Sequence, residues 1–429
     1  MRVDISKKNI LGDGVTDYTV ALQNIIDMLS GNGGGELYFP AGRYLTGSLY
    51  IKSNITINLG SGAVLAASGN YELYPVITQN DVLGFTRGTH RGILYAADEK
   101  NITIKGEGII DGCGDSWWES GKTDTQRPRT IQFINCSRIR IEGISIINSP
   151  CWTINPICCT DVAICGISIK NPYKSPNTDG INPESCKNVR ISDCCVDVGD
   201  DCITIKSGLE TDILQKQYPC ENITVTNCTL IHGHGGVVIG SEMSGGVRNV
   251  TISNCVFQNT DRGIRIKTRR KRGGCVENIM VSNLIMDSVM AGITVNAYYQ
   301  CGAKPDDMEL FSQEALPVVE TTPTMKDMLF SNIIMKNVRA AGIYLLGLPE
   351  MPVQNIRMTN LNITVEGCAD GEYAVAAYHA EKSFGDGIVL EHAKDIYIDN
   401  CFVTAPKNKF IMKKIKNVWI NGDACEKNH

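Results

Sequence analysis

The sequence predicts an all-β fold, a right-handed parallel β-helix of about ten coils. A short pattern, an Asn or Asp followed by alternating apolar residues, recurs along the chain, for example at residues 188–191, 222–225 and 249–252. Most copies are 22 to 40 residues apart, which leaves room for two or three short strands in each repeat. Self-similarity at such a period indicates stacked repeats, and β-branched residues at period two favour strands over helices.

One helix is expected before the repeats begin, within residues 16–30. Apolar residues between positions 18 and 30 are spaced at helical intervals, and Thr16 or Asp17 is a suitable N-cap. A single amphipathic helix ahead of many strands can cap the open end of a solenoid, because stacked repeats need protected ends. The glycine-rich residues 31–35 end the helix, and the first short strand is expected at residues 36–39.

Each repeat starts at an anchor residue. The anchors are Asn54, Asn101, Arg138, Asp161, Asn188, Asn222, Asn249, Asn278, Asp327, Asn355, Asp395 and Asn417. Two intervals, of 47 residues after Asn54 and 49 residues after Asn278, exceed a plain coil and predict protruding loops near residues 60–100 and 300–325. We expect one domain over residues 1–429, without a linker. A β-sandwich or a propeller is the alternative, against which the coil-like period argues.

Two positions within the repeat carry further structural predictions. Five residues after the anchor, an asparagine recurs at Asn227, Asn254, Asn283, Asn332, Asn360 and Asn400. Asparagine tolerates a left-handed backbone and bonds its neighbours, so these residues are expected to form a hydrogen-bonded ladder at one corner. The next position holds Cys194, Cys228, Cys255 or Cys401 in four repeats and Ile167, Leu284, Ile333 or Leu361 in others. Cysteine therefore exchanges with Ile and Leu, as a small, buried, reduced thiol does.

The bulk composition excludes several classes of protein. The net charge of −5 argues against a nucleic-acid-binding protein, which usually has a basic domain. The first residues have no apolar signal core behind them, and no stretch reaches the length of a membrane span. No two of the eighteen cysteines are three residues apart, so the common zinc-knuckle spacing is missing. We expect a cytoplasmic protein, or a secreted one if a leader has been removed. The sequence does not predict the oligomeric state.

Four polar blocks stand in consecutive repeats, at residues 177–180, 199–201, 233–235 and 265–267. Asp200 follows its anchor by twelve residues and His234 follows the next anchor by twelve, which predicts a separation of one coil, about 4.8 Å. Each block alone is weak, since Asp-Asp is usually a turn, Asn-Thr-Asp-Gly is good turn chemistry, and Gly-His-Gly can simply satisfy a corner. All four blocks in order on adjacent coils favour a site where Asp179, Asp200, Asp201, His234, Arg265 and Lys267 converge.

The residue types point to the cleavage of a glycosidic bond. Crowded carboxylates cannot all ionise easily, so one is expected to keep a proton at neutral pH. A protonated acid beside ionised ones is what glycoside hydrolysis needs, and in the inverting version the ionised carboxylates activate a water molecule. The cations Arg265 and Lys267 suggest a sugar that carries its own carboxylate.

The four blocks, Asn-Thr-Asp, Gly-Asp-Asp, Gly-His-Gly and Arg-Ile-Lys, resemble the signatures of the polygalacturonase-type glycoside hydrolases of family 28, and the resemblance covers nearly the whole chain. It implies a pectin-lyase-like solenoid and inversion without a metal or other cofactor. By this resemblance Asp200 is the general acid, Asp179 and Asp201 hold and deprotonate the attacking water, and His234 supports the protonation of the acid pair. The same resemblance assigns substrate binding to Asn177, Arg265, Lys267 and a tyrosine, Tyr298 or else Tyr299.

The mode of cleavage is suggested by local features. Residues 262–272 hold seven basic side chains, a field suited to drawing in an acidic oligosaccharide, although Arg269 to Arg272 can also be read as a solvated basic loop. This run looks like that of the exo-acting bacterial members, and two long loops can wall off one end of a cleft. We therefore expect exo-cleavage of α-1,4-linked oligogalacturonides.

Three alternatives stay open at this point. A calcium-dependent pectate lyase shares the solenoid and the substrate, and Asp179, Asp200 and Asp201 can be recast as calcium ligands. The block order and His234 count against it. A non-catalytic glycan-binding solenoid needs no acids converging on a histidine. A family 28 hydrolase of rhamnogalacturonan or another uronide-bearing glycan is compatible with all the motifs.

Overall fold

The computed structural model describes residues 1–78, 88–123, 126–211, 218–304 and 306–424. The chain forms two compact units, an N-terminal unit of residues 1–200 with 211–215 and a C-terminal unit of residues 201–210 with 216–429. The expectation of one domain over the whole chain stays a prediction. Within the described ranges, no helix is both long enough and apolar enough to span a membrane.

The N-terminal unit is built from short parallel strands in three ladders. The first ladder contains β1 (Arg2–Asp4), β3 (Gly35–Phe39), β6 (Ile55–Leu59), β9 (Lys100–Gly106), β12 (Ser137–Glu142), β15 (Thr160–Cys165) and β17 (Lys187–Ser192). The second contains β2 (Asp13–Asp17), β4 (Gly42–Thr46), β7 (Ala63–Ala67), β10 (Ile109–Asp111), β13 (Ser145–Ile147), β16 (Ser168–Lys170) and β18 (Cys195–Val198). The third contains β5 (Leu49–Tyr50), β8 (Leu94–Ala97), β11 (Ile131–Ile134) and β14 (Ile154–Ile157). One strand per coil in each ladder is the architecture of a parallel β-helix.

Columns of aliphatic side chains fill the inside of this unit. Ile102, Ile139, Val162 and Val189 are register partners on successive strands and are each at most 2% exposed. Because side chains alternate between the two faces of a strand, the polar residues between these positions point outward. The alternating apolar pattern that follows each anchor is therefore the core pattern of the coil.

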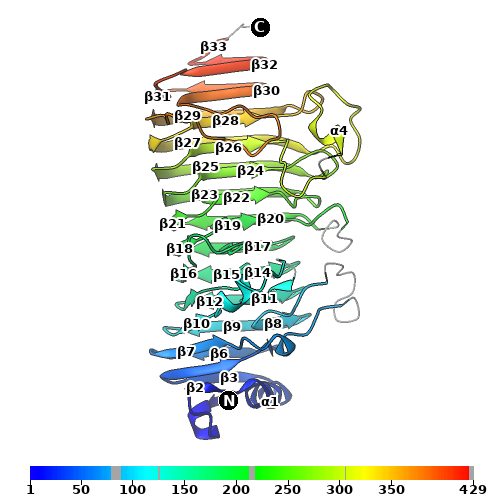
Figure 1. The fold of residues 1–429 in the computed structure, drawn as a ribbon, viewed down its shortest axis with the longest axis vertical. Coiled ribbons are helices and arrows are strands. Elements are labelled where there is room, and N and C mark those ends of the chain that lie inside the picture. Colours follow the sequence, from blue (N-terminus) through cyan, green and yellow to red (C-terminus); the bar gives the residue numbers. More distant parts are fainter. Residues whose placement is uncertain (79–87, 124–125, 212–217, 305, 425–429) are drawn as a thin grey trace. The chain divides into compact units, whose positions relative to one another are not determined.

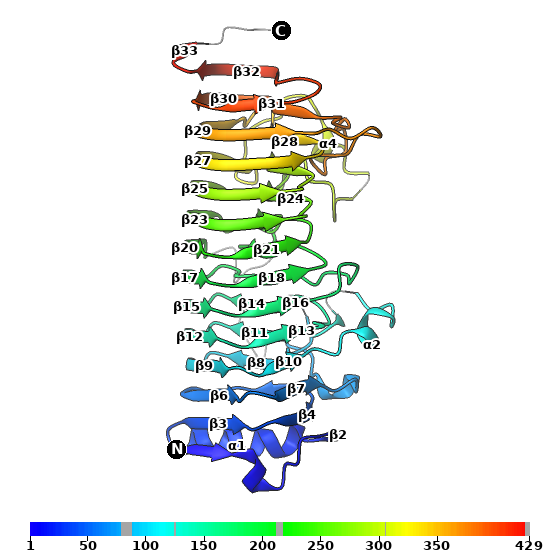
Figure 2. The same cartoon turned by 90° about the vertical axis from the view of Figure 1, so that its left-hand side faces the viewer.

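The helix expected near the N-terminus is α1 (Thr19–Gly31). Its buried face consists of Leu22, Ile25, Ile26 and Leu29. Figure 2 shows α1 alongside β3, and the helix contacts β3, β5 and β6. The N-cap position is Tyr18, which makes no side-chain cap bond. Asp17, one of the two predicted caps, instead accepts a hydrogen bond from the backbone N–H of Thr19 at 2.9 Å.

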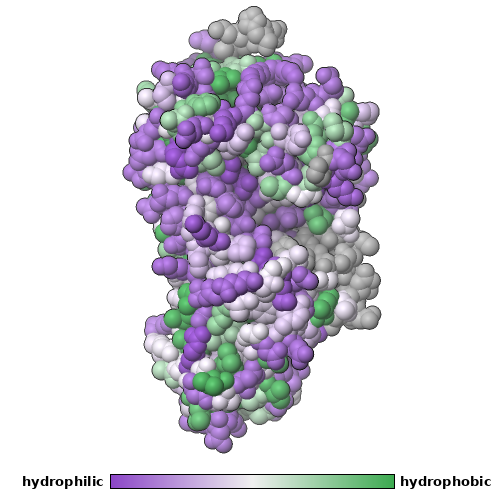
Figure 3. Space-filling view, in the orientation of Figure 1, coloured by the Kyte–Doolittle hydropathy of each residue, from purple (hydrophilic) through white to green (hydrophobic). Residues whose placement is uncertain are grey.

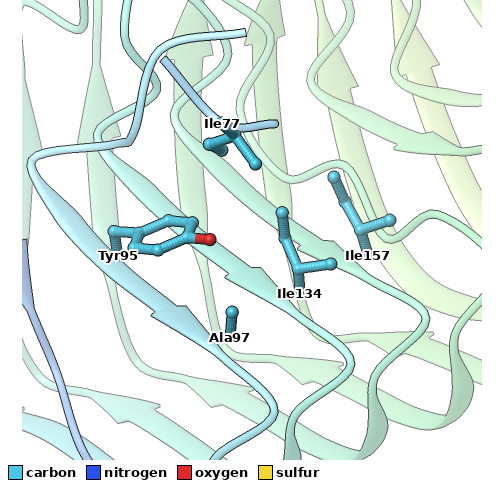
Figure 4. Packing of buried hydrophobic residues seen from close by; sticks show 5 residues of the cluster. All are labelled: Ile77, Tyr95, Ala97, Ile134 and Ile157. Atoms are coloured by element: carbon cyan, nitrogen blue, oxygen red, sulfur yellow. The ribbon is translucent and has the colours of Figure 1, made fainter. Parts of the chain in front are cut away.

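The long interval after Asn54 contains a loop between β7 and β8, as predicted. Its described part packs Ile77 against Tyr95, Ala97, Ile134 and Ile157 of the third ladder (Figure 4). Tyr95 and Ala97 lie on the strand face opposite to that of Leu94. The loop therefore covers the outer face of this ladder. Residues 79–87 of the predicted loop lie outside the described part of the chain. The unit also contains α2 (Asp115–Trp118) and the 3-10 helices η1 (Ile5–Lys8) and η2 (Tyr71–Leu73).

The C-terminal unit repeats the same architecture with longer strands (Figure 1). One ladder contains β19 (Ile203–Ile205), β22 (Val237–Gly240), β24 (Arg262–Lys267), β26 (Ala291–Asn296), β28 (Ala341–Leu346) and β30 (Asp386–Asp399). The others contain β20 (Cys220–Thr226), β21 (Thr229–His232), β23 (Val247–Gln258), β25 (Cys275–Asp287), β27 (Thr324–Val338), β29 (Val353–Val365), β31 (Phe402–Thr404) and β32 (Phe410–Ile420). These strands pair in parallel, and β33 (Asp423–Ala424) joins β32 antiparallel.

The asparagine ladder predicted at one corner is confirmed in the C-terminal unit. Each rung is a side-chain hydrogen bond from one asparagine amide to the preceding one, and the rungs are Asn283 to Asn254 (3.3 Å), Asn332 to Asn283 (3.2 Å), Asn360 to Asn332 (3.0 Å) and Asn400 to Asn360 (2.7 Å). All five residues have a left-handed backbone, with φ between 49° and 56°. The partners of successive rungs are 29, 49, 28 and 40 residues apart in sequence. The anchors are left-handed too, and Asn249 and Asn278 continue a second ladder of the same kind.

The cysteines behave as the repeat pattern predicted. Cys194, Cys228 and Cys255 are at most 2% exposed, whereas Cys401 is half-buried. All seventeen cysteines in the described ranges are free thiols. In the same slot Leu284 and Ile333 are also buried, so the position accepts apolar side chains of different sizes.

The second long loop leaves β26 and returns at β27, and it contains the short helix α4 (Met308–Phe311). A third segment, residues 366–385 between β29 and β30, was not predicted as a long loop. Figure 3 shows one face of the C-terminal unit, in the upper part of the picture, where hydrophilic side chains predominate over scattered hydrophobic ones.

Candidate active site

Asn177 opens the first polar block, and Arg127 fixes its side chain. Asn177 has a left-handed backbone, with φ at 54°, which asparagine adopts more readily than most residues. The buried guanidinium of Arg127 donates to Asn177 Oδ1 at 2.6 Å and to the carbonyl oxygens of Pro150 at 2.8 Å and Pro176 at 2.6 Å. Since the oxygen of the Asn177 amide is bound, its NH₂ group is the donor that this residue can offer to a ligand.

Asp179, in the same block, is 3% exposed and is held by a neutral amide. Asn182 Nδ2 donates to Asp179 Oδ2 at 3.1 Å. The backbones of both residues are bound to the neighbouring coil, because Thr153 N–H donates to the carbonyl of Asp179 and Asn182 N–H donates to that of Ile154. A hydrogen bond from an amide favours the ionised carboxylate without adding a charge. Sequence reasoning missed Asn182, although it follows Asp179 by three residues.

Asp200 is the last residue of the N-terminal unit before the chain crosses at Asp201. It is partly exposed, which leaves it reachable from solvent. A Cβ atom at Gly199 would lie 2.5 Å from the carbonyl oxygen of Ser175 and 2.7 Å from that of Pro172. The glycine of the Gly-Asp-Asp block is therefore required by the close approach of the adjacent turn.

Asp201 belongs to the C-terminal unit, where two cations bind it. Asp201 Oδ1 lies 3.1 Å from Arg265 Nη1, and Oδ2 lies 2.7 Å from Lys267 Nζ. Arg265 and Lys267 are two residues apart on β24, so their side chains project from the same face of the strand. All three residues are at most 7% exposed, which makes this a buried ion triad.

The electrostatics of the triad fix the charge of Asp201. Burial alone would raise the pKa of Asp201, but the charges of Lys267 and Arg265, the hydrogen bond from Lys267 and the charge of Lys206 outweigh it. Together they hold the pKa of this carboxyl well below its usual range. Asp201 is therefore ionised at neutral pH, and it cannot be the carboxyl that keeps a proton.

Lys206 is a buried cation that sequence reasoning missed. It follows the Asp-Asp pair at the end of β19, is 4% exposed, and its Nζ lies 2.9 Å from Glu242 Oε2. Its signal was present, because Thr204 and Lys206 interrupt an otherwise apolar strand at period two.

His234 is half-exposed and is bound by a carboxylate. Its Nδ1 lies 2.8 Å from Asp261 Oδ2, and the side chains are 54% and 27% exposed. The flanking glycines have separate reasons. Gly233 has φ at +71°, and a Cβ atom at Gly235 would lie 3.1 Å from Asp201 Oδ1 and would overlap the side chain of Val238. The glycine at position 235 therefore lets the chain of this block pass close to the Asp201 carboxylate.

The expectation for Tyr298 is not met by its position. Tyr298 is 1% exposed, and its ring lies 4.5 Å from that of His379 and 5.3 Å from the Arg270 guanidinium. The ring of Tyr299 is the one that lies near the cations, 5.6 Å from the Arg265 guanidinium and 5.2 Å from Lys267 Nζ. Consecutive residues of an extended segment point to opposite sides, so only one of the two tyrosines can face β24.

Arg269, Arg270 and Arg272, at the end of the basic run, have a structural role, so the interpretation of this part as a solvated loop is wrong. The electrostatic attraction of an acidic oligosaccharide stays a prediction. Arg269 donates to the carbonyl oxygens of Cys301 and Gly302, and Arg270 pairs with Glu350 at 2.6 Å and donates to three loop carbonyls. Both arginines are at most 8% exposed, and so is Arg272. Of the cations 269–272 only Lys271 is largely exposed, and Asp307 binds it at 2.6 Å. These side chains hold the loop after β26 in place.

Residues 373–377 form a strap across the ladder that carries Arg265 and Lys267. Arg262, the first residue of β24, donates to the carbonyl oxygens of Tyr373 at 2.7 Å and Ala374 at 3.0 Å. Asn296, the last residue of β26, donates to the carbonyl oxygen of Ala376 at 3.2 Å, and Tyr299 pairs with Ala377. Arg262 stands at the start of its strand and Asn296 at the end of its strand. The strap therefore spans the ladder from one end of the strands to the other. Figure 1 shows this orange segment in front of β26 and β28.

Asp201 is poorly suited to bind a metal ion. Both of its oxygens already face cations, and a divalent ion placed there would be repelled by Arg265 and Lys267 at short range. The predicted convergence of all four blocks involves both units and stays a prediction. Within single units, the structure joins Asp201 to Arg265 and Lys267, and it places Asn177 and Asp179 in one turn.

A family model described as glycosyl hydrolases family 28 matches residues 86–383, more than half of the chain. The chain belongs to this family, and it is an enzyme, a glycoside hydrolase of the polygalacturonase type. The resemblance drawn from the four blocks is thereby confirmed.

Individual relatives agree with this assignment. A probable polygalacturonase of Vitis vinifera is 35% identical over 365 residues, which cover 82% of this chain and 72% of the relative. An exo-poly-alpha-D-galacturonosidase of Dickeya chrysanthemi is 26% identical over 451 residues, covering 85% and 74%. The solved structure of an exopolygalacturonase from Thermotoga maritima, 29% identical, covers 100% of this chain and 93% of its own with a TM-score of 0.75. The similarity to that structure confirms the parallel β-helix.

Proposed function

We propose that the enzyme is an inverting exo-hydrolase that cleaves α-1,4-galacturonosidic bonds of oligogalacturonides. The observation that carries the proposal is the buried Asp201, kept ionised by Arg265 and Lys267. A carboxylate that does not take up a proton at neutral pH can accept a hydrogen bond from water throughout the reaction. Inverting hydrolysis needs such a group opposite a second carboxyl that donates a proton.

The roles follow from the environments of the three aspartates. Asp201 holds and orients the attacking water, and Asp179, which accepts a hydrogen bond from the neutral amide of Asn182, takes up the proton that the water loses as it attacks the sugar. Asp200, partly exposed and next in sequence to Asp201, is the general acid that protonates the leaving oxygen. His234, whose imidazole is oriented by a hydrogen bond to Asp261, supports the protonated state of that acid.

Recognition of an acidic sugar is assigned to β24 and its surroundings. Arg265 has five N–H donors and Lys267 has three, and each uses one of them on Asp201. These two cations are assigned to the carboxylate of a galacturonate unit because their charge and donor groups suit it, and the Tyr299 ring lies beside them. Asn177 contributes the NH₂ group that Arg127 leaves available.

The strap supports exo-cleavage. A sugar chain that lies along the outer face of β24 and β26 meets residues 373–377, which run across that face. A substrate therefore has to end there. The names of the relatives from Dickeya chrysanthemi and Thermotoga maritima agree with this mode of cleavage.

The reaction is tested by proton NMR with trigalacturonate, first with EDTA and then with added calcium. We expect monomeric galacturonate that appears first as the β-anomer and is unaffected by EDTA. Calcium-dependent vinyl protons of an unsaturated product would mean a lyase and would remove the roles given to the aspartates. If trigalacturonate stays intact, rhamnogalacturonan fragments are the next substrates, since the same site suits other uronide-bearing glycans.

The exo mode is tested by replacing residues 373–379 with two glycines. We expect the variant to cleave internal bonds, so that the viscosity of polygalacturonate falls faster for each bond broken than it does with the wild-type enzyme. An unchanged product pattern from a folded variant would show that the strap does not limit the substrate.

Asp200→Asn tests the acid. We expect turnover to fall by about a thousandfold, within the range of general acid catalysis, with the fold and substrate binding retained. Asp395→Asn is the matched control, because it introduces the residue that most other anchors have, and it should leave activity unchanged. Appreciable turnover by Asp200→Asn would contradict the assignment.

Lys267→Ala tests the recognition of the sugar carboxylate. We expect the KM for galacturonate oligomers to rise more than the KM for the corresponding methyl esters, which lack the charge. The comparison is made by initial rates on both substrates, and an equal effect on the two would remove the proposed role.

A further inference from the structure

Asp261 was not singled out by the sequence, yet it lies against the histidine of the third polar block. Its Oδ2 is 2.8 Å from His234 Nδ1. Asp261 stands immediately before β24, and His234 stands before β22 in the neighbouring coil. The two turns are tied together, because the backbone N–H of Asp261 donates to the carbonyl oxygen of Gly233 at 2.9 Å.

The bond determines how the imidazole is oriented. A carboxylate only accepts hydrogen bonds, so Nδ1 of His234 must carry the proton. The other ring nitrogen, Nε2, then points away from Asp261, and it is the nitrogen that a substrate or an acid can meet. The His234 side chain is 54% exposed, and the hydrogen bond to the Asp261 carboxylate restrains its rotation.

Asp261 is itself fixed in position and in charge. Burial would raise its pKa, but the hydrogen bond from His234, the charge of Arg262 and further charges outweigh it and lower the pKa below its usual value. Arg262 Nη1 lies 3.8 Å from Asp261 Oδ2, and the carbonyl oxygens of the strap bind the same guanidinium. The charge of Arg265 also lowers the pKa of the Asp261 carboxyl. The acceptor of His234 is therefore a carboxylate that is ionised at neutral pH and is held beside Arg262.

We infer that Asp261 is a positioning residue for the hydrolytic reaction, and that it acts by holding His234 in one orientation and one tautomer. The inference rests on the proposed function for its catalytic consequence. It also predicts a property of the free enzyme, the proton on Nδ1, which does not depend on any substrate. A role limited to the stability of the turn would leave His234 untouched.

The kinetic experiment compares Asp261→Asn and Asp261→Ala with the wild-type enzyme on trigalacturonate. We expect kcat to fall about tenfold for the asparagine variant, which keeps an acceptor, and about a hundredfold for the alanine variant, with KM nearly unchanged. Asp287→Ala is the matched control, since Asp287 ends β25 in the same unit and binds Lys336 and Asn337 instead. The control should keep its kcat.

A double-variant cycle decides whether Asp261 acts through the histidine. We expect Asp261→Ala to have almost no further effect on kcat when His234→Gln is already present. Equal losses of kcat in both backgrounds would overturn the inference, as would a loss confined to KM.

The tautomer is measured separately by ¹⁵N NMR of the imidazoles, of which the chain has six. We expect the neutral ring of His234 to carry its proton on Nδ1 in the wild-type enzyme and to lose this preference in Asp261→Ala. An unchanged tautomer would refute the positioning role even in an active enzyme. Absence of hydrolysis together with the expected tautomer would instead count against the proposed function alone.

Discussion

The two units hold the same kind of residue, a buried aspartate, in opposite electrostatic settings. In the N-terminal unit Asp179 receives a hydrogen bond from the neutral amide of Asn182, and this amide continues a polar column with Gln132 and Asn155. In the C-terminal unit Asp201 lies between Arg265 and Lys267. An amide orients a carboxylate, whereas two cations also fix its charge. The difference shows how one residue type supplies two functions.

The largest expected effect is on the free energy of unfolding, which the replacement of Asp201 should lower more than the replacement of Asp179. Asp201→Asn leaves two buried cations without their carboxylate, and we expect a loss of about 3–5 kcal/mol. Asp179→Asn keeps a neutral hydrogen-bonding partner for Asn182, and we expect a loss of about 1 kcal/mol. Urea denaturation monitored by circular dichroism measures both. Similar losses would mean that the cations do not depend on Asp201.

The second prediction concerns acid. The pKa of Asp201 is lowered in the folded enzyme, so its contribution to stability is complete above the unfolded value of about 3.9 and is lost as pH falls further toward the folded pKa. The difference in urea midpoint between the wild-type enzyme and Asp201→Asn should therefore be constant from pH 7 to about pH 5 and shrink below pH 4. Asp395→Asn serves as control. A difference that grows as pH falls would reverse the sign of the argument.

The third prediction concerns the N-terminal unit, where the guanidinium of Arg127 positions Asn177. Arg127→Lys replaces a planar group that donates to four acceptors with a single ammonium, and we expect kcat/KM to fall about 10- to 100-fold because Asn177 and Asp179 shift. Arg140→Lys, at an exposed ion pair in the same unit, should have no effect on initial rates. Equal behaviour of the two variants would contradict the proposed clamp.

The smallest expected effect is a change in the free energy of unfolding that is similar in the two units. Cys194→Val and Cys228→Val occupy the same slot of the repeat, one in each unit, and both side chains are 2% exposed. We expect each to change the free energy of unfolding by less than about 1.5 kcal/mol, because the volume and polarity are nearly conserved. Thermal denaturation measures both. A large loss in either variant would show a role for the thiol beyond packing.

Much of the scaffold was predictable because it repeats. Alternating apolar residues, corner asparagines and the cysteine slot recur often enough that each copy supports the others. The four polar blocks were equally visible, since they recur in consecutive repeats beside or within otherwise apolar strands. The periodicity describes the coil, and the core positions, the corner asparagines and the cysteine slot lie where the repeat predicts them.

The remaining residues depend on contacts between segments far apart in sequence. No residue near Arg262 in the sequence indicates that its guanidinium binds carbonyl oxygens more than a hundred residues away. The strap that supplies these oxygens has no distinctive composition. Tyr298 and Tyr299 are adjacent and chemically identical, so only the direction of the chain after β26 decides which ring faces β24. The basic run looked like an electrostatic field because its buried acceptors are mostly backbone carbonyls, which a sequence does not display.

The corner ladder of the C-terminal unit has a consequence for how such enzymes diversify. Asn283 and Asn332 form a rung at 3.2 Å although 49 residues separate them, and Asn332 and Asn360 form one at 3.0 Å across 28 residues. The ladder therefore joins one coil to the next whatever the length of the chain between its rungs. Evolution can lengthen, exchange or delete a loop between two rungs without disturbing the register of the strands. New substrate preferences can then arise in loops such as the one after β26, while the machinery on β24 stays in place.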